Sequence, residues 1–301
     1  MQNYLNILHD INTRGRAKIA RTYKTTGIFD AQWSFDLSTG KFPMMTTRKL
    51  GQKSMAAELW CFIHGITSKK TFQDMGCTFW DEWCNPKKLP PYLVDDAKKD
   101  FMALEDDLGP IYGYQWRNFG EPYIPGKSLT INSAGDQLAH AASLLRTNPD
   151  DRRLIVSAWS YCQIPQMALP PCHVLFNLVH YEGTLNLKWH QRSCDMVLGV
   201  PYNIACYSLL LLLLARHANL RPGVVSGTLC DAHIYDGGTV NHSEGVAIQL
   251  QREPRELPTC EIVDNNIHNK QYPFDIFQWK PEHFKLVDYN PHPTIKFNVA
   301  V

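Results

Sequence analysis

The segment from residue 154 to residue 229 constrains the fold most, because strand-like runs and one long apolar helix follow one another in it. Runs rich in β-branched and aromatic residues predict four strands, at Leu154–Trp159, Val174–His180, Thr184–Trp189 and Val224–Leu229. A helix over Asn203–Ala218 is expected between the last two strands, and its apolar run Leu209–Leu214 is too short to span a membrane. This helix is therefore expected to lie in a protein core.

The rest of the chain adds predicted helices and one strand, with no boundary that would divide it into domains. The helices are expected at Tyr4–Lys18, Ser54–His64 and Gln137–Arg146, and the strand at Thr25–Leu37. No Gly/Ser/Pro-rich linker or internal repeat interrupts the 301 residues, so we expect one α+β domain over residues 1–301, built around a mostly antiparallel sheet. The charged, proline-containing stretch 87–107 is expected to be a surface insertion in that domain.

Charge and cysteine content exclude several classes of protein. The 30 Lys and Arg nearly balance the 29 Asp and Glu, so no overall field draws the chain to nucleic acid or to a membrane. Nine cysteines without a Cys-x-x-Cys pair predict neither a metal site nor a disulfide framework. The start Met1-Gln2-Asn3-Tyr4 does not resemble a signal peptide, and we therefore expect a reduced, cytoplasmic protein.

Cys172 is the candidate nucleophile. Pro170 and Pro171 fix the backbone before it and remove two N–H donors, so the approach to the thiol is rigid. The alternative is an ordinary buried cysteine that only packs. His173 follows directly, but neighbours on a strand point to opposite faces, which argues against the Cys–His pair of a cysteine hydrolase.

Because the chain is nearly neutral overall, binding of an anion would require a local cluster of cations, and arginines are the candidates. Arg192 and Ser193 provide a bidentate guanidinium and a hydroxyl, which suit a phosphate group, and a cation beside Cys172 would favour its thiolate. A surface salt bridge is the alternative for Arg192. Arg21 and the pair Arg152-Arg153 resemble solvated charges when each is taken alone.

Further positions carry groups that can read a nucleotide or move a proton. The amide of Asn203 can meet both the O4 acceptor and the N3–H donor of uracil, although Asn at the start of a helix is also a common N-cap. Asp231, His233 and Tyr235 alternate along a strand end, where they would share one face and could bind sugar hydroxyls; a core histidine is the alternative. Glu58 lies in an apolar helix, and burial would raise its pKa into the range useful for proton transfer.

Together these segments resemble the folate-dependent thymidylate synthase family. The motifs stand in the family's order: Thr46-Thr47, Glu58, Trp80-Asp81-Glu82-Trp83, Leu108-Gly109-Pro110-Ile111-Tyr112-Gly113, Arg152-Arg153, Pro170-Pro171-Cys172-His173, Gln191-Arg192-Ser193-Cys194-Asp195, Leu198 to Ala205, His233-Ile234-Tyr235, Gln249-Leu250, Arg252-Glu253-Pro254 and the tail from Pro291 to Val301. The resemblance covers most of the chain. It implies a curved mixed sheet with flanking helices, packed sheet to sheet against a second copy in a homodimer, instead of a mostly antiparallel sheet.

The resemblance also implies a role for each site residue. Cys172 would add to C6 of dUMP, while Glu58, Tyr112 and His173 would act on protons and orientation at the ring. Nucleotide binding would fall to Arg21, Gln191, Arg192, Ser193, Asp195, Asn203, His233 and Tyr235, with Arg152 and Arg153 donated by the second subunit. The folate side would comprise Phe79, Trp80, Trp83, Leu169, Asp195, Leu198, Gly199, Tyr202, Ala300 and Val301.

The reaction implied is reductive methylation of dUMP to dTMP, with 5,10-methylenetetrahydrofolate as co-substrate and no metal. A hydroxymethylase, in which water attacks the exocyclic methylene intermediate, is the alternative. For either reaction dCMP or CMP is less favoured than dUMP, because Asn203 matches uracil. Trp80 and the apolar tail Val299-Ala300-Val301 favour methylation because they would exclude water. An inactive nucleotide-binding regulatory homologue is the non-enzyme alternative, although such a protein would be expected to lack the thiol or the arginines.

The chain departs from the family pattern near the nucleotide. Leu229-Cys230-Asp231 replaces the usual Gly-Gly-Asp, Asp236–Val240 is inserted after the His-x-Tyr pair, and His190 replaces a tyrosine. These changes leave two questions open, namely methyl or hydroxymethyl product and deoxyribose or ribose substrate.

Overall fold

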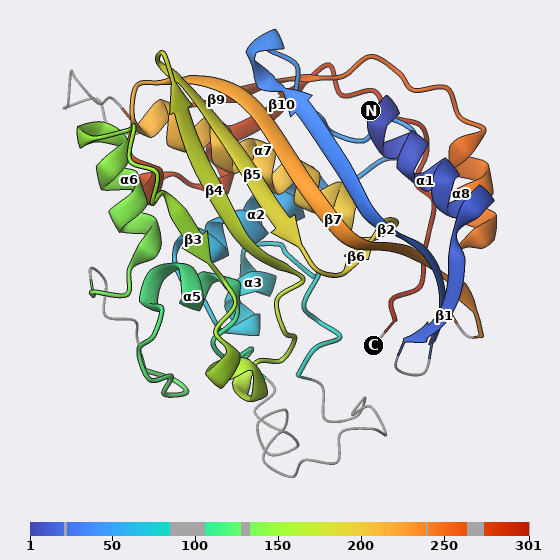
Figure 1. The fold of residues 1–301 in the computed structure, drawn as a ribbon, viewed down its shortest axis with the longest axis horizontal. Helices are drawn as coiled ribbons and strands as arrows, with labels where there is room; N and C mark the ends of the chain where they lie inside the picture. Colours follow the sequence, from blue (N-terminus) through green and yellow to red (C-terminus); the bar gives the residue numbers. More distant parts are fainter. Residues whose placement is uncertain (21–22, 85–105, 128–132, 239, 264–273, 301) are drawn as a thin grey trace.

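A large mixed sheet with helices packed behind it forms the centre of the protein (Figure 1). The computed structural model describes the chain except for residues 21–22, 85–105, 128–132, 239, 264–273 and 301. The α-helices are α1 Gln2–Arg14, α2 Gln52–Ile63, α3 Lys69–Asp74, α5 Tyr112–Asn118, α6 Gln137–Thr147, α7 Gly199–His217 and α8 Ser243–Leu250. The strands are β1 Arg16–Ala20, β2 Tyr23–Asp36, β3 Ile155–Ser157, β4 His173–Tyr181, β5 Thr184–Gln191, β6 Cys194–Asp195, β7 Arg221–Gly237, β8 Val240–Asn241, β9 Thr259–Ile262 and β10 Phe284–Val287.

The strand order explains why the large sheet is mixed. It runs β1-β2-β7-β5-β4-β3, and β6 and β8 also pair with β7. Neighbouring strands of this sheet are antiparallel except for β5–β7 and β6–β7, which are parallel. Parallel strands need a crossover connection, and α7 supplies it on the way to β7. The mixed sheet with flanking helices is confirmed, and the expectation of a mostly antiparallel sheet misses these two pairs.

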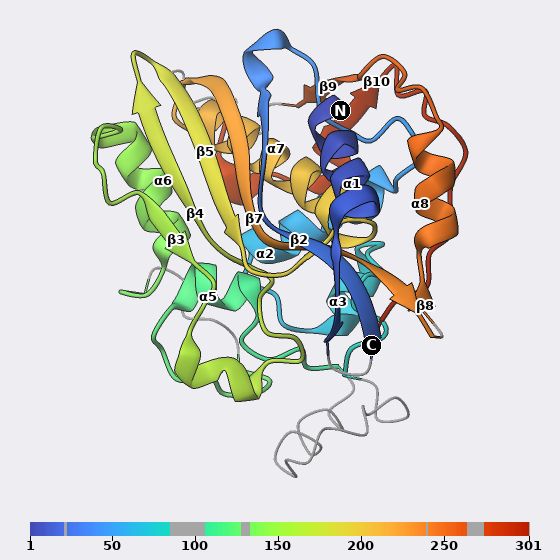
Figure 2. The same ribbon diagram turned by 45° about the vertical axis from the view of Figure 1, so that its right-hand side comes forward.

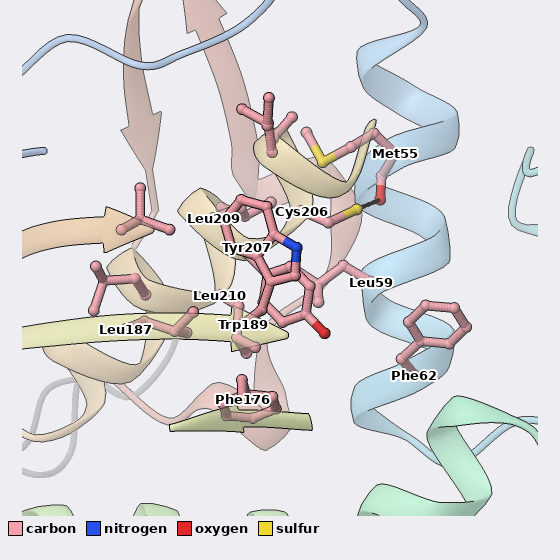
Figure 3. Packing of buried hydrophobic residues seen from close by; sticks show 14 of the residues in the cluster. Met55, Leu59, Phe62, Phe176, Leu187, Trp189, Cys206, Tyr207, Leu209 and Leu210 are labelled. Carbon is pink, nitrogen blue, oxygen red and sulfur yellow. Dashed lines mark hydrogen bonds between the residues drawn. The ribbon is translucent and has the colours of Figure 1, made fainter. Parts of the chain in front are cut away.

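Helix α7 forms the centre of the core, as its apolar run predicted. Its fully buried leucines are Leu209, Leu210, Leu211, Leu213 and Leu214. Tyr207 stacks on Trp189 of β5 with 5.1 Å between the ring centroids, and both lie in the cluster of Figure 3. By length and composition α7 could cross a membrane, yet 72% of its apolar window is buried inside the protein, as in the core helix of a globular protein. The helix begins at Gly199, before the predicted start at Asn203.

The face of the sheet away from α7 carries exposed apolar side chains. In Figure 1 this face is turned to the viewer, with α2 and α7 behind it. Along β4, Phe176 and Leu178 are buried towards the core, whereas Val179 and Tyr181 are 42% and 70% exposed. Ile155 of the neighbouring β3 is 44% exposed. Apolar surface of this kind is typical of a face that binds another protein.

The N-terminal boundary differs from the prediction. Helix α1, which packs across β2 (Figure 2), ends at Arg14 and not at Lys18. Gly15 leaves the helix in an extended conformation with φ −61° and ψ 149°, and Arg16–Ala20 form β1. Since the side chains of β1 are almost all exposed, no apolar alternation in the sequence marks it as a strand.

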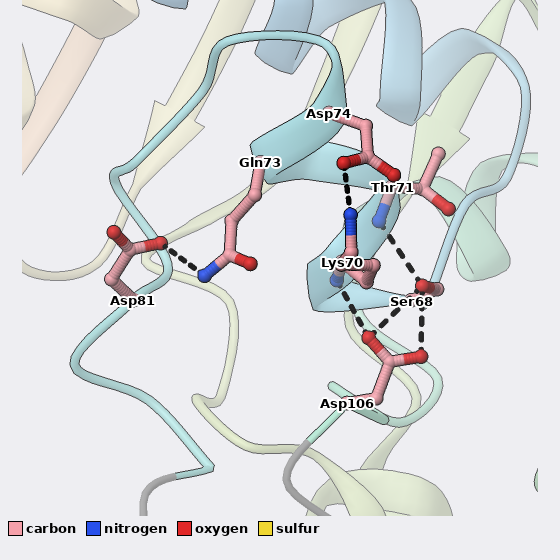
Figure 4. Close-up of polar contacts among 7 residues, drawn as sticks. All are labelled: Ser68, Lys70, Thr71, Gln73, Asp74, Asp81 and Asp106. Carbon is pink, nitrogen blue, oxygen red and sulfur yellow. Dashed lines mark hydrogen bonds and ion pairs between the residues drawn. The ribbon is translucent and has the colours of Figure 1, made fainter.

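A polar cluster at the start of α3 holds the segment that returns after residue 105 (Figure 4). Ser68 Oγ caps α3 and donates to Asp106 Oδ2 at 2.9 Å. Gln73 Nε2 donates to Asp81 Oδ1 at 2.9 Å, which ties the loop after α3 to the same helix. The predicted surface insertion 87–107 lies outside the described residues, apart from its last two.

Candidate active site

The backbone of Cys172 is held from two sides at the start of β4. Its N–H donates to Tyr112 Oη of α5 at 2.7 Å, and its carbonyl oxygen accepts from Arg192 N–H at 2.8 Å. The thiol is half-buried and is not part of a disulfide. A thiol on a backbone fixed in this way has a defined direction of attack, which suits a nucleophile better than a cysteine that only packs.

Arg192 lies beside the loop that carries the thiol. Its Nε donates to Pro171 O at 2.8 Å and its Nη2 to Pro170 O at 3.0 Å. The guanidinium also lies over the ring of Trp159, 5.1 Å from the centroid. These hydrogen bonds use two of the five N–H donors of an arginine and fix the orientation of the others. The residue is exposed, so the predicted role as an anion-binding cation is compatible with its position.

His173 points away from Cys172 into the core. Its Nδ1 shares a hydrogen bond of 2.7 Å with Tyr207 Oη, and its ring stacks on Tyr112 at 4.1 Å. Burial lowers the pKa of His173 to about 3, so the ring is neutral at neutral pH. This geometry does not form the Cys–His pair of a cysteine hydrolase, as the alternation along the strand predicted. A direct catalytic role for His173 stays a prediction.

Asn203 is oriented by a relay of hydrogen bonds from the core. Trp189 Nε1 donates to Gln191 Oε1 at 3.1 Å, and Gln191 Nε2 donates to Asn203 Oδ1 at 3.1 Å. Gln191 is 2% exposed, and its second N–H reaches Ser193 O at 3.1 Å. Because Asn203 lies inside α7, whose N-cap is Leu198, the interpretation of Asn203 as an N-cap is wrong. An oxygen lone pair and an amide N–H₂ are left to face a ligand.

Glu58 is a buried carboxyl on α2. Its residue is 9% exposed, and burial raises the pKa of Glu58 to about 7. Trp80 Nε1 donates to its Oε1 at 3.0 Å and partly offsets that shift. Trp80 itself is 4% exposed, so the structure buries it beside the carboxyl, and its role on the folate side stays a prediction. A carboxyl with this pKa can give or accept a proton near neutral pH.

A small, partly open cavity lies between Glu58 and Asn203. It has a volume of about 10 Å³ and room for roughly one water molecule. Its lining includes Glu58, His173, Asn203, Cys206 and Tyr207. The buried acid and the amide therefore open onto one space, next to the residues that hold the nucleophile.

The predicted sugar-binding residues lie on β7 beside the Arg192 loop. β6 pairs with β7 so that Asp195 lies opposite His233. His233 is 5% exposed, its Nδ1 bonds to Asp231 O at 2.9 Å, and its ring meets Tyr235 edge-on at 5.5 Å. The pairing of β6 with β7 thus brings two distant motifs, Gln191–Asp195 and His233–Tyr235, into one site.

The predicted folate side is a set of half-buried apolar surfaces. Phe79 and Tyr202 face each other with 4.5 Å between ring centroids, and Tyr202 Oη accepts from Gly51 N–H at 3.2 Å. Asp195 Oδ1 accepts from the N–H groups of Val197 and Leu198 and so shapes the entry into α7. The partly buried members of the set are Phe79, Trp83, Leu169, Leu198, Gly199, Tyr202 and Ala300. Flat aromatic and aliphatic surfaces of this kind fit a planar ring system.

Four predicted residues are not placed at this site. Arg152 and Arg153 are exposed just before β3, the last strand of the sheet, and Arg153 pairs with Asp151 at 3.5 Å. Arg21 and Val301 lie outside the described residues.

Sequence reasoning missed several residues that contact the predicted ones. Trp159 lies against Arg192, Tyr207 bonds to His173, and Cys206 reaches Glu58. Each of them resembles an ordinary core residue in the sequence. The spacing of Cys206 and Tyr207, three and four positions after Asn203 and hence on the same face of a helix, could have drawn attention to both.

A half-buried thiol, a fixed cation, an oriented amide and a buried acid are the groups that covalent addition to a heterocycle carried by an anion would use. The sequence model of the thymidylate synthase family matches residues 2–301. The chain therefore belongs to the thymidylate synthase family, whose members are methyltransferase-type enzymes acting on dUMP with methylenetetrahydrofolate.

Proposed function

We propose that this protein methylates dUMP to dTMP with 5,10-methylenetetrahydrofolate, through a covalent bond between Cys172 and C6 of the pyrimidine. The observation that carries the proposal is the relay from Trp189 through Gln191 to Asn203. It fixes one amide oxygen and leaves a donor beside an acceptor, the pattern that uracil requires. Together with family membership, this relay favours a uracil nucleotide over a cytosine nucleotide.

The described residues can divide the proposed chemistry among them. Attack of the Cys172 thiolate on C6 places negative charge at O4 and C5 of the ring, and the amide of Asn203 donates to O4. Arg192 supplies a cation for the phosphate and for the thiolate beside it. Glu58, with a pKa of about 7, exchanges the protons at O4 and C5. Tyr112 holds the backbone of the nucleophile.

The bound folate supplies the one-carbon unit and, in methylation, the hydride. The apolar surface that would hold its ring is offered by Phe79, Tyr202, Leu169 and Leu198. The proposed reaction requires no metal ion. Exclusion of water from the site favours methylation over hydroxymethylation. Trp80 contributes to this exclusion, because it is 4% exposed and packs edge-on against Phe62 and Tyr112.

Hydroxymethylation of dUMP, or less favourably of dCMP or CMP, is the second candidate. The cavity beside Glu58 and Asn203 has room for roughly one water molecule, the reactant that a hydroxymethylase needs at this place. A regulatory protein that only binds nucleotide is the non-enzyme alternative. The half-buried thiol and the arginine fixed beside it speak against this alternative, since nucleotide binding alone needs no nucleophile.

We further propose a single cytoplasmic domain that forms a homodimer sheet to sheet. The face away from α7 supports the dimer, since Val224 of β7, which precedes the buried Val225, is 39% exposed and adds to the exposed apolar residues of β3 and β4. Arg152 and Arg153, exposed at that edge, would reach the phosphate site of the second subunit. The nine cysteines form no disulfide, which fits a reducing compartment.

Product analysis tests the proposal. The protein is incubated with dUMP and methylenetetrahydrofolate, dihydrofolate is followed by absorbance, and the nucleotide product is identified by mass. Thymidylate with dihydrofolate is expected; a hydroxymethyl nucleotide with tetrahydrofolate would overturn methylation. The mechanism-based inhibitor 5-fluoro-dUMP should form a stable adduct on Cys172 with the folate present. An intact thiol after this incubation would remove the enzyme hypothesis. Sedimentation velocity, with Tyr181→Asp as the interface variant, tests the dimer.

A further inference from the structure

The two oxygens of the Glu58 carboxyl have different neighbours. Trp80 Nε1 donates to Oε1, whereas Cys206 Sγ of α7 lies 4.0 Å from Oε2. The same sulfur lies 3.7 Å from Met55 O on α2, the contact drawn in Figure 3. The Cys206 thiol therefore lies between two acceptors, and only one of them, the carboxyl, changes its charge.

Burial favours the uncharged form of the titratable neighbours of Glu58 among the described residues. Cys206 is 7% exposed, and burial raises its pKa well above the usual value, so the sulfur keeps its proton and remains a donor. The other titratable groups around the carboxyl come from α2, the loop after α3, α5, β4 and α7: Cys61, Cys77, Tyr112, His173 and Tyr207. Burial raises the pKa of these thiols and phenols and lowers that of His173. The charge of Glu58 therefore depends on its burial and on its own hydrogen bonds, and not on a charged neighbour.

We propose that Cys206 is a positioning residue for Glu58: the S–H of Cys206 bonds to the carboxylate when Glu58 is ionised and turns to Met55 O when Glu58 is protonated. One S–H can serve only one acceptor at a time, and its rotation moves no heavy atom of the core. Cys206 follows Asn203 by three residues, so both lie on one face of α7 and line the same cavity. Helix α7 would thus carry both Asn203, which is proposed to bind the pyrimidine ring, and Cys206, whose hydrogen bond responds to the protonation of Glu58. The proposal rests on the proposed use of Glu58 in proton transfer.

An infrared pH titration of the Glu58 carboxyl in the full-length protein tests this contact without any substrate. Subtracting the infrared spectrum of the matching Glu58→Gln variant from that of each protein isolates the carboxyl band of Glu58. Cys206→Ala removes a donor to the charged form, so the midpoint should rise by about 0.5–1 pH unit. Cys77→Ala is the matched control, because it removes another buried thiol whose hydrogen bond goes to the Phe79 backbone. Equal midpoints in these two variants would overturn the proposal.

A second variant keeps the test decisive if Cys206→Ala does not fold. Cys206→Ser replaces S–H with the stronger O–H donor, so the midpoint should fall below that of the wild type. An unchanged midpoint would count against the contact. In turnover, the acidic limb of the kcat profile should follow the infrared midpoint, while KM for dUMP stays unchanged. A wild-type protein that does not turn over dUMP would refute the proposed function, whereas the titration would still decide the role of Cys206.

Discussion

The substitution Asn203→Asp should shift the preference of the site from uracil towards cytosine. Gln191 Nε2 donates to Asn203 Oδ1 at 3.1 Å, and an aspartate oxygen keeps that bond, so the side chain should remain in place. Only the outer group changes, from an N–H₂ donor to an oxygen acceptor. That oxygen would face O4 of uracil as one acceptor against another, whereas the N4–H₂ group of cytosine would donate to it.

The size of the effect follows from this single exchange. A buried polar group that loses its partner costs about 1–3 kcal/mol, and groups that carry charge cost more. Replacing the donor by an ionised acceptor adds repulsion, so we expect about 3–5 kcal/mol against dUMP in the transition state. At about 1.4 kcal/mol for each factor of ten, kcat/KM for dUMP should fall roughly 10²–10⁴-fold. The value for dCMP should fall less or rise.

The assay compares kcat/KM for dUMP and dCMP at one folate concentration, with nucleotide products identified by mass and equilibrium binding measured separately. Asn219→Asp is the matched control, an exposed amide just beyond the other end of α7, and it should behave like the wild type. If Asn203→Asp keeps the wild-type preference for dUMP while remaining folded, the amide does not read the ring and the reasoning is wrong.

Trp80→Phe should raise the pKa of Glu58 above about 7, because the hydrogen bond from Nε1 favours the ionised carboxylate. At about 1.5–3 kcal/mol for a bond to a charged group, the acidic limb of kcat should move up by about 1–2 pH units; Trp83→Phe should leave it in place. Burial lowers the pKa of His173 to about 3 and that of His217 to about 4. In the unfolded chain a histidine has a pKa of about 6.5, so below this pH the unfolded state binds protons that the folded state does not. Their contribution is complete well above that pH, and from pH 6.5 to 5 it should lower the unfolding free energy by about 3 kcal/mol. Glu58 acts in the opposite sense, because its folded pKa is raised, so urea unfolding is best compared in Glu58→Gln; a flat profile there would contradict the argument.

The elements that bury an apolar face were predictable from the sequence. The runs that became β4, β5 and α7 carry period-two or helical spacing, because each packs one side or all sides against the core. β1 was hidden because its side chains are exposed. The expected start of α7 at Asn203 was too late, because the helix begins at Gly199 and Pro201 fits its first turn.

The site was predictable in its residue types but not in its contacts. Motif spacing pointed to Cys172, Arg192, Asn203 and Glu58. The hydrogen bond from Cys172 to Tyr112, however, joins residues that are 60 positions apart. Such a contact depends on how α5 packs against β4, which no local pattern encodes. The raised pKa of Glu58 was foreseeable because an acid in an apolar helix is either exposed or desolvated.

Helix α7 couples the stability of the core to the proposed recognition of the nucleotide by Asn203. Trp189 stacks on Tyr207 in the core and, through Gln191, begins the relay that fixes Asn203. A rotation of α7 large enough to turn the amide would have to separate that stack and the buried leucines behind it. The core therefore holds the backbone that carries the amide, and the hydrogen bond from Gln191 fixes the orientation of the amide itself. Discrimination between uracil and cytosine requires this rigidity, because a side chain that could turn over would offer its donor and acceptor in either order.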